Sequence, residues 1–234
     1  MKLCAITGGA GALGSALARH LVKSGWKVAL YDTDRAKGRL EELAKELGAA
    51  TYAGDFALAA TWNEALASTK KTLGGAPTHA ALIAGGWAGG ASLHEAKDDS
   101  AYESMMKANV DTAYRALRAL LPPMVAAKDG AIVVVGSRAA VRPWTSTGAA
   151  AYAASKSAVI TLAEAVAQEV LNDNVRINAV MPSTMDTPAN RASMPKADPT
   201  KWVSLESASG VIAFLLSDAA KDISGAALPL YGRA

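Results

Sequence analysis

Residues 3–14 have the sequence Leu3-Cys4-Ala5-Ile6-Thr7-Gly8-Gly9-Ala10-Gly11-Ala12-Leu13-Gly14, in which an apolar run passes directly into a glycine-rich turn. The apolar run predicts a short buried strand over 3–7, and the helical periodicity of residues 15–24 predicts a helix after the turn. Glycines let a backbone approach a pyrophosphate, and a helix N-terminus offers free N–H groups and the positive end of a dipole. Such turns also join strands to helices for packing alone, but the order strand, turn, helix favours a phosphate-binding turn.

The rest of the chain repeats this alternation of strand and helix. Apolar runs predict further strands over 27–31, 51–53, 79–84, 131–135, 175–180 and 226–230. Helical patterns fall between them, at about 35–47, 59–73, 98–128 (as two helical pieces), 150–171 and 206–217. Residues 183–204 carry several prolines and are expected to be irregular. We therefore expect an α/β fold in one domain over residues 1–234: a Rossmann-type, doubly wound parallel sheet of about seven strands with helices on both faces.

The composition excludes several classes of protein. The chain has 234 residues, 51% of them apolar, and a net charge of only +3 without a Lys/Arg cluster, so we expect no nucleic-acid partner. A single cysteine, Cys4, excludes an intrachain disulfide and a cysteine-based zinc site, and we expect no metal. The first strand begins too early for a signal peptide, and no apolar run approaches ~20 residues. These features predict a cytoplasmic protein without a membrane partner.

Asp32 stands at the end of the second predicted strand, at a spacing from Gly14 close to that at which an acid meets the adenosine ribose of a dinucleotide. A carboxylate there accepts a hydrogen bond from the 2′-hydroxyl of NAD and repels the 2′-phosphate of NADP. The glycine turn holds no Lys or Arg, and Arg35 is the only nearby cation. We therefore expect NAD to be preferred over NADP. The alternative is that Asp32 caps the next helix, although Asp34 could serve for that instead.

Tyr152 and Lys156 lie four residues apart in the small-residue stretch 147–160, so a helix would place them on one face. A neighbouring ammonium favours the phenolate and lowers a phenol pKa that starts near ~10. Such a tyrosine can act as a general acid or base near neutral pH. Taken alone, the pair is explained as simply by a core aromatic residue and a solvated lysine.

Two further polar residues stand where a ligand would bind. Ser137 follows the fifth predicted strand, at the sheet edge that receives ligands in open parallel sheets. Asn109 falls within a predicted helical region, where asparagine has a low propensity, and this favours a specific role for the side chain. The simpler alternative is an amide that is hydrogen-bonded locally or solvated. The histidines, His20, His79 and His94, are interpreted as structural or surface residues.

In this combination the chain resembles the short-chain dehydrogenase/reductase family over nearly its whole length. The family's Thr-Gly-x-x-x-Gly-x-Gly motif corresponds to residues 7–14, with Ala12 in place of the middle glycine. Its Asn-x-x-x-Pro-Gly segment corresponds to residues 178–183, with Ser183 in place of the glycine. Its four catalytic residues match Asn109, Ser137, Tyr152 and Lys156, although the spacing from Ser137 to Tyr152 is about two residues longer than usual.

The resemblance also implies the residues that surround the cofactor and the substrate. The implied cofactor contacts are Gly8, Ala12, Leu13, Gly14, Asp32, Asp55, Phe56, Ala84, Gly85, Tyr152, Lys156, Pro182 and Thr187. Among these, Asp55 matches the acid that contacts adenine, and Thr187 matches the residue that contacts the nicotinamide amide. Residues 184–204 would form a lid over the substrate. The implied substrate-side residues are Trp87, Trp144, Met185 and Trp202.

The activity implied by the resemblance is hydride transfer between a nicotinamide and a small carbonyl compound or secondary alcohol, with Tyr152 as general acid/base. Residues 84–90 and 186–198 instead resemble dihydropteridine reductases, a branch that lacks the usual Ser and Asn kept here. Reduction of a quinonoid dihydropterin, or a catalytically silent NAD-binding regulator, are therefore the alternatives. Family members commonly associate through two helices that correspond to about 108–128 and 150–171, so a homotetramer or a dimer is expected.

Overall fold

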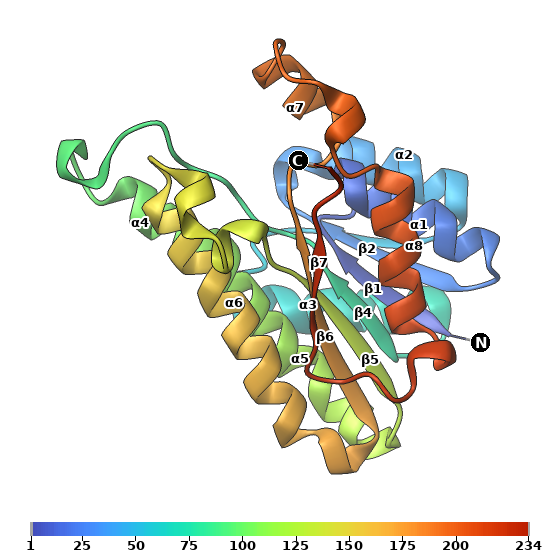
Figure 1. Cartoon of the computed structure of the whole chain (residues 1–234). Helices are drawn as coiled ribbons and strands as arrows, with labels where there is room; N and C mark the ends of the chain where they lie inside the picture. The colour runs from blue at the N-terminus through green and yellow to red at the C-terminus, as the bar shows by residue number, and fades with distance from the viewer. Residues whose placement is uncertain (1, 234) are drawn as a thin grey trace.

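The computed structural model describes residues 2–233, which form one parallel sheet with helices packed on it. The seven strands are β1 (Leu3–Thr7), β2 (Lys27–Asp32), β3 (Ala50–Ala53), β4 (His79–Leu82), β5 (Gly130–Val135), β6 (Val175–Pro182) and β7 (Ala227–Leu230). Their order in the sheet is β3-β2-β1-β4-β5-β6-β7, and every pair is parallel (Figure 1). The predicted doubly wound parallel sheet is confirmed.

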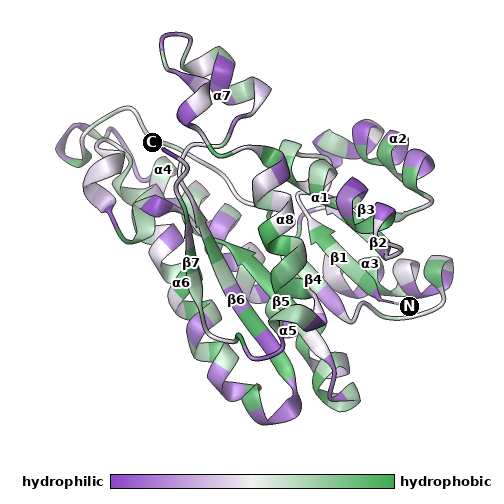
Figure 2. Ribbon diagram, turned by 45° about the vertical axis from the view of Figure 1, so that its right-hand side comes forward, coloured by the Kyte–Doolittle hydropathy of each residue, from purple (hydrophilic) through white to green (hydrophobic). Residues whose placement is uncertain are grey.

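Helices cover both faces of the sheet (Figure 1). They are α1 (Ala12–Lys23), α2 (Lys37–Leu47), α3 (Ala59–Leu73), α4 (Ser100–Met105), α5 (Thr112–Ala127), α6 (Ala150–Glu169), α7 (Pro188–Ser193) and α8 (Leu205–Leu216). Side chains of α3, α5 and α6 share one buried cluster with the strands, and those of α1, α2 and α8 share the other. With both faces covered, the central strands β1, β4 and β5 are buried at every residue, as their unbroken apolar runs require. Figure 2 shows this as hydrophobic strands between helices with mixed surfaces.

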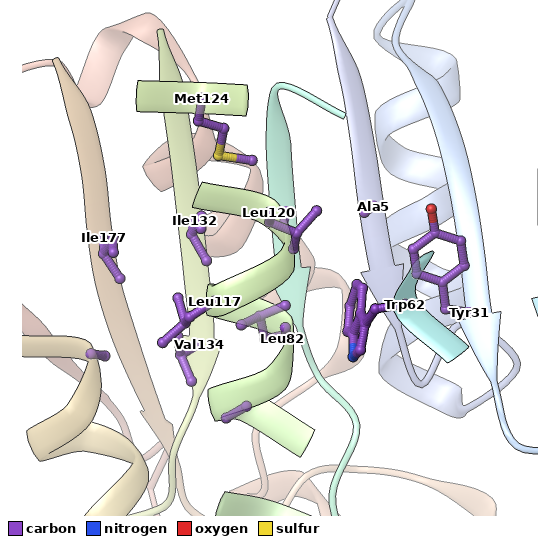
Figure 3. Packing of buried hydrophobic residues seen from close by; sticks show 14 of the residues in the cluster. Ala5, Tyr31, Trp62, Leu82, Leu117, Leu120, Met124, Ile132, Val134 and Ile177 are labelled. Atoms are coloured by element: carbon purple, nitrogen blue, oxygen red, sulfur yellow. The ribbon is translucent and has the colours of Figure 1, made fainter. Parts of the chain in front are cut away.

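The packing on the α5 face is close. Leu117, Leu120 and Met124 project from one side of α5 onto the strands, where Figure 3 shows them beside Ile132 and Val134. All five side chains are at most 3% exposed. Burial of this kind contributes about 1.5–3 kcal/mol for each large apolar side chain and fixes the helix against the sheet. The site described below is therefore carried on a rigid support.

Several boundaries differ from those predicted. β4 ends at Leu82 and not at residue 84, because the next two N–H groups donate to the side chain of Thr7 and leave the sheet. Helix α7 lies within 183–204, where irregular structure was expected. Thr187 accepts a hydrogen bond from the backbone N–H of Asn190, and Pro188 occupies the first helical position, so a cap and a proline start the helix.

The region 98–128, predicted as two helical pieces, contains two helices joined by a turn of a different kind. Helix α4 passes into a π-helical turn, Met106–Asp111, before α5 begins. Asn109, the residue that a regular helix disfavours, lies in this turn. Turns of this type occur mostly at functional sites. No helix within residues 2–233 is long and apolar enough to cross a membrane.

The register of the sheet brings distant segments to one edge. Thr7 pairs with Tyr31 on one side and with Leu82 on the other, so the residues that follow β1, β2 and β4 lie together at the carboxyl edge. β1 and β4 flank the point at which the strand order reverses, which is where open α/β sheets bind ligands.

Candidate active site

The glycine turn between β1 and α1 is packed too closely for side chains at two positions. Gly8 has a φ of +68°, and a Cβ atom there would lie 3.1 Å from the Ala84 nitrogen. A Cβ atom at Gly14 would lie 2.1 Å from the Gly8 carbonyl oxygen. Ala12 and Leu13 form the start of α1, so the replacement of the middle glycine by Ala12 leaves the turn intact. The turn presents backbone, without side chains, to the sheet edge.

A cavity of about 510 Å³ lies next to this turn. Its walls are the residues that follow β1 to β4 on one side, and Ser104, Lys107, Ala108 and Thr112 on the other. Six predicted cofactor residues line it, namely Gly8, Asp32, Asp55, Phe56, Ala84 and Gly85. The volume lies within the range of small-molecule sites. The structure thus brings these six residues together around a space of suitable size.

Asp32 joins the second strand to the glycine turn. Its Oδ2 atom accepts a hydrogen bond of 3.0 Å from the Ala10 nitrogen, and its Oδ1 atom accepts one of 2.7 Å from the Thr33 nitrogen. No side chain caps α2, so the alternative of a helix cap at Asp32 or Asp34 is wrong. The carboxylate lies in the cavity wall and is held by backbone donors, where a ribose hydroxyl could reach it.

Asp55 forms an ion pair across the cavity. Its Oδ2 atom is 2.8 Å from Lys107 Nζ, and Oδ1 accepts a hydrogen bond from the Ala57 nitrogen. The hydrogen bond with Lys107 lowers the pKa of Asp55, and the Ala57 N–H acts in the same direction. Sequence reasoning missed Lys107, because only the tertiary fold brings the π-helical turn beside the end of β3.

Ser137 and Tyr152 meet at the carboxyl edge of β5. The Ser137 side chain interacts with the Tyr152 phenol and opposes the rise in its pKa, so the longer spacing between them does not separate the two side chains. The intervening chain is taken up in two 3-10 turns, Arg138–Ala140 and Pro143–Ser146. Ser137 Oγ also accepts a hydrogen bond from the Ala139 nitrogen, which holds the hydroxyl in place.

The protonation of Tyr152 differs from the expectation that Lys156 would lower its pKa. Burial raises the pKa of Tyr152, and the hydrogen bond from Ser137 opposes this rise. Lys156 is 6% exposed, and its Nζ atom donates to the Val135 carbonyl at 2.9 Å. Burial lowers the pKa of Lys156 to about 8. Burial is the leading cause at both residues, and each favours its neutral form more than in water.

Asn109 is buried in the π-helical turn with its amide fully engaged. Oδ1 accepts from the Gly86 nitrogen at 2.9 Å, and Nδ2 donates to the Ser155 hydroxyl at 2.9 Å and to the Gly86 carbonyl at 3.3 Å. The side chain therefore ties the glycine-rich loop after β4 to α6. Ser155 was not singled out by sequence reasoning, since small polar residues in helices carry no distinctive signal.

The predicted substrate side is more open than the cofactor side. None of Pro182, Met185, Thr187, Trp87, Trp144 and Trp202 lines the cavity of about 510 Å³ in the described residues. Trp87 and Trp144 are 65% and 71% exposed, on loops beside the sheet edge. Met185 pairs with Val203 in an isolated bridge, which closes the base of the segment 184–204, and Thr187 caps α7.

Comparison with known proteins gives the family. The protein-family model described as short chain dehydrogenase matches residues 2–198 of this chain. A 2,5-dichloro-2,5-cyclohexadiene-1,4-diol dehydrogenase of Sphingobium indicum is 31% identical, over 99% of this chain and 95% of its own. The 3-oxoacyl-[acyl-carrier-protein] reductase MabA of Mycobacterium bovis is 29% identical, over 97% of this chain and 90% of its own.

Solved structures agree with this assignment. An oxidoreductase of the short chain dehydrogenase/reductase family from Burkholderia thailandensis superposes with a TM-score of 0.84 at 32% identity, covering 99% of this chain and 91% of its own. NAD⁺-bound xylitol dehydrogenase superposes with a TM-score of 0.87 at 26% identity, covering 99% and 98%. With a family match over most of its length and relatives that are dehydrogenases and reductases, this chain belongs to the short-chain dehydrogenase/reductase family of nicotinamide-dependent oxidoreductases.

Proposed function

We propose that the protein transfers a hydride between NAD(H) and a small ketone or secondary alcohol, with Tyr152 as the general acid/base. The observation that carries this proposal is the grouping of Ser137, Tyr152 and buried Lys156 at the carboxyl edge of β5, where Ser137 interacts with the Tyr152 phenol and Lys156 donates to the Val135 carbonyl. Two hydroxyl donors on neighbouring side chains can share one substrate oxygen. The relatives named above include a diol dehydrogenase and a 3-oxoacyl reductase, whose substrates carry such an oxygen.

The cofactor side fits a dinucleotide. The close approach of Gly14 to the Gly8 carbonyl leaves a bare backbone cradle for a pyrophosphate, with Ala12 and Leu13 at the helix N-terminus. Asp32 would accept from the adenosine ribose, and Asp55 and Phe56 would border the adenine. When bound, the nicotinamide gives or takes the hydride at the substrate carbon. Pro182 and Thr187, on the segment after β6, would border the nicotinamide.

NAD is proposed as the preferred cofactor. Asp32, Asp34 and Asp55 line the cavity with only Arg35 and Lys107 as cations, and Lys107 is paired with Asp55. A 2′-phosphate would therefore meet Asp32 with Arg35 as the one cation in the cavity wall that forms no ion pair among the described residues. Like charges brought together in this way oppose binding.

The protein's own groups explain how a ketone would be reduced. The raised pKa of Tyr152 keeps its proton at neutral pH, so the phenol can donate to the oxygen that gains charge. Ser137 would hydrogen-bond the same oxygen, and donors aimed at developing charge contribute roughly 10²–10³-fold each. Lys156, one turn along α6, would supply positive charge that stabilises the phenolate left behind. In the oxidative direction the phenolate is needed, so alcohol oxidation should increase with pH.

We further propose that the whole chain acts as one catalytic domain with residues 184–204 as its lid. Helix α7 stands away from the sheet above the carboxyl edges of the strands (Figure 1). The segment is closed at its base by hydrogen bonds from Asp186 N to Val203 O and from Val203 N to Thr184 O, of 2.8 and 2.9 Å. Such a closed base with an exposed tip suits a loop that settles on a bound substrate.

The test compares ketones, secondary alcohols and quinonoid dihydropterin with the wild type, Tyr152→Phe and Ser137→Ala. We expect ketone or alcohol turnover, a loss of about 10²–10⁴-fold in Tyr152→Phe, and nearly unchanged NADH binding, because the ring keeps its packing. Retention of more than a tenth of the wild-type rate in Tyr152→Phe would show that Tyr152 is not the acid. Efficient pterin reduction without ketone activity, insensitive to Ser137→Ala, would establish the pterin alternative.

A further inference from the structure

A chain of buried hydrogen bonds connects the glycine-rich loop after β4 to the backbone of Tyr152. The Gly86 N–H donates to Asn109 Oδ1 at 2.9 Å, and Asn109 Nδ2 donates to Ser155 Oγ at 2.9 Å. The Ser155 hydroxyl in turn donates to the Tyr152 carbonyl oxygen at 2.8 Å. Asn109 is 1% exposed and Ser155 is 0% exposed, so water does not compete for these bonds.

Each bond in this chain fixes the direction of the next. Because the Ser155 proton is committed to the Tyr152 carbonyl, Ser155 Oγ is left as an acceptor. The amide of Asn109 must then present its NH₂ group to Ser155 and its oxygen to the Gly86 N–H. The reverse orientation would set NH₂ against N–H and leave the Ser155 oxygen without a donor. Ser155 and Gly86 together therefore orient the amide.

The oriented oxygen faces the same space as the lysine ammonium. A methyl group added at Gly85 would lie 2.5 Å from Asn109 Oδ1 and 3.1 Å from Lys156 Nζ, so both atoms border one point. Lys156 also lies at a cavity of about 10 Å³, and within the described chain no other charged side chain lines it. The titratable neighbour is Tyr152, one turn away on α6. The Lys156 ammonium thus donates to the Val135 carbonyl, and the Asn109 amide oxygen borders the same space.

We infer that Ser155 is a positioning residue: it holds the Asn109 amide with its oxygen toward Lys156 and so favours the charged lysine. The inference rests on the proposed function, in which that charge supports Tyr152. The pKa of Lys156 is lowered to about 8 by burial, close enough to working pH for one oriented dipole to change how much ammonium is present. Ser155 touches neither the Tyr152 hydroxyl nor the lysine nitrogen; it acts through Asn109.

The test is Ser155→Ala, with Ser209→Ala as its matched control. Ser209 is also a buried helical serine, 1% exposed, but its hydroxyl has no hydrogen-bond partner in the described residues. We expect Ser155→Ala to lower kcat/KM by about tenfold at neutral pH, or about 1.4 kcal/mol. The loss should grow as pH rises, because the variant loses its ammonium at lower pH. Ser209→Ala should keep the wild-type dependence of kcat/KM on pH. If kcat/KM of Ser155→Ala runs parallel to that of the wild type across the pH range, the inference is overturned.

A double-mutant cycle separates positioning from general destabilisation. If Ser155 acts through Asn109, then Ser155→Ala added to Asn109→Ala should cost little further activity, whereas independent roles would multiply the two losses. If Ser155→Ala folds poorly, Ser155→Cys keeps a side chain of similar volume but offers the Asn109 amide only a weak sulfur acceptor, and it should show the same displaced pH profile. If Tyr152→Phe is inactive and the pH profile of Ser155→Ala matches that of the wild type, only this inference is refuted. If Tyr152→Phe is active, the proposed function itself is refuted.

Discussion

At Tyr152 and Lys156 the surroundings decide the protonation more than the spacing does. A four-residue step predicts two side chains on one face, and α6 provides that. It does not indicate how deeply the pair is buried, and burial moves the pKa of Tyr152 up and that of Lys156 down. The spacing in the sequence thus identified the pair. The direction in which the pKa of Tyr152 moves depends on packing, which only the fold determines.

Asp32 offers the clearest residue-level test of cofactor choice. Removing its carboxylate in Asp32→Ala deletes both the expected bond to the ribose hydroxyl and the repulsion of a phosphate. We expect the wild type to bind NADH more tightly than NADPH. In the variant, the difference in binding free energy between the two cofactors should shrink by about 1–3 kcal/mol. Dissociation constants measured at one ionic strength check this. Asp34→Ala, which removes a cavity-lining carboxylate without contacts to the glycine turn, is the control. Equal or tighter NADPH binding by the wild type would contradict the expectation.

Among the elements, the glycine turn was predictable and the π-helical turn was not. Strand, glycines and helix follow one another directly in the sequence, and Gly14 packs onto the Gly8 carbonyl as that order requires. The π-helical turn carries Lys107 and Asn109, whose partners, Asp55 and Gly86, come from other parts of the chain. Local patterns therefore predicted two helical pieces there, whereas the wider turn between them and its ion pair depend on long-range contacts.

The close contact at Gly14 predicts a large effect from one methyl group. A Cβ atom 2.1 Å from the Gly8 oxygen meets backbone, which cannot move without separating α1 from the turn. We expect Gly14→Ala to lower the free energy of unfolding by several kcal/mol, roughly in the range of overpacked cores, and to weaken NADH binding. Gly38→Ala in α2 is the matched control, because nothing lies within 4 Å of the added atom. It should stabilise the protein by up to about 1 kcal/mol. Denaturant titration of both variants decides the matter.

At the scale of the whole molecule, surfaces remain that the isolated chain does not cover. Tyr102 in α4, Tyr114 in α5 and Leu171 after α6 are 56%, 44% and 50% exposed. Tyr114 and Leu171 lie within 108–128 and 150–171, the segments through which a homotetramer or dimer was expected, and Tyr102 lies on the preceding helix. We expect light scattering at micromolar concentration to give a mass at least twice 23.9 kDa. Tyr114→Asp should shift the protein towards smaller species if this face is the interface. A monomer mass for the wild type would refute the expectation.

The opposite edge of the sheet carries a buried histidine that should make stability depend on acid. His79 begins β4, is 3% exposed, and contacts Trp26 edge-on at 4.8 Å between ring centroids. Burial, followed by the charge of Lys2, lowers its pKa to about 4, against about 6.5 in an unfolded chain. Well above pH 6.5 the ring is neutral in both states and pH has no effect through it. Between pH 6.5 and 4 the unfolded chain binds a proton that the folded chain does not.

Stability should therefore fall with pH across that interval, by up to about 3 kcal/mol from this residue alone. Replacing the ring in His79→Gln removes a proton site, so the variant should be less stable at pH 7 but lose less than the wild type between pH 7 and 4.5. His94→Gln, at an exposed position, should keep the wild-type dependence. Asp218 is coupled to His79, because the imidazole charge is one of the smaller causes that lower the pKa of Asp218. The difference between the curves therefore reports His79 together with this coupling. Parallel curves for the wild type and His79→Gln would show that the imidazole is already charged, or hydrated, in the folded protein.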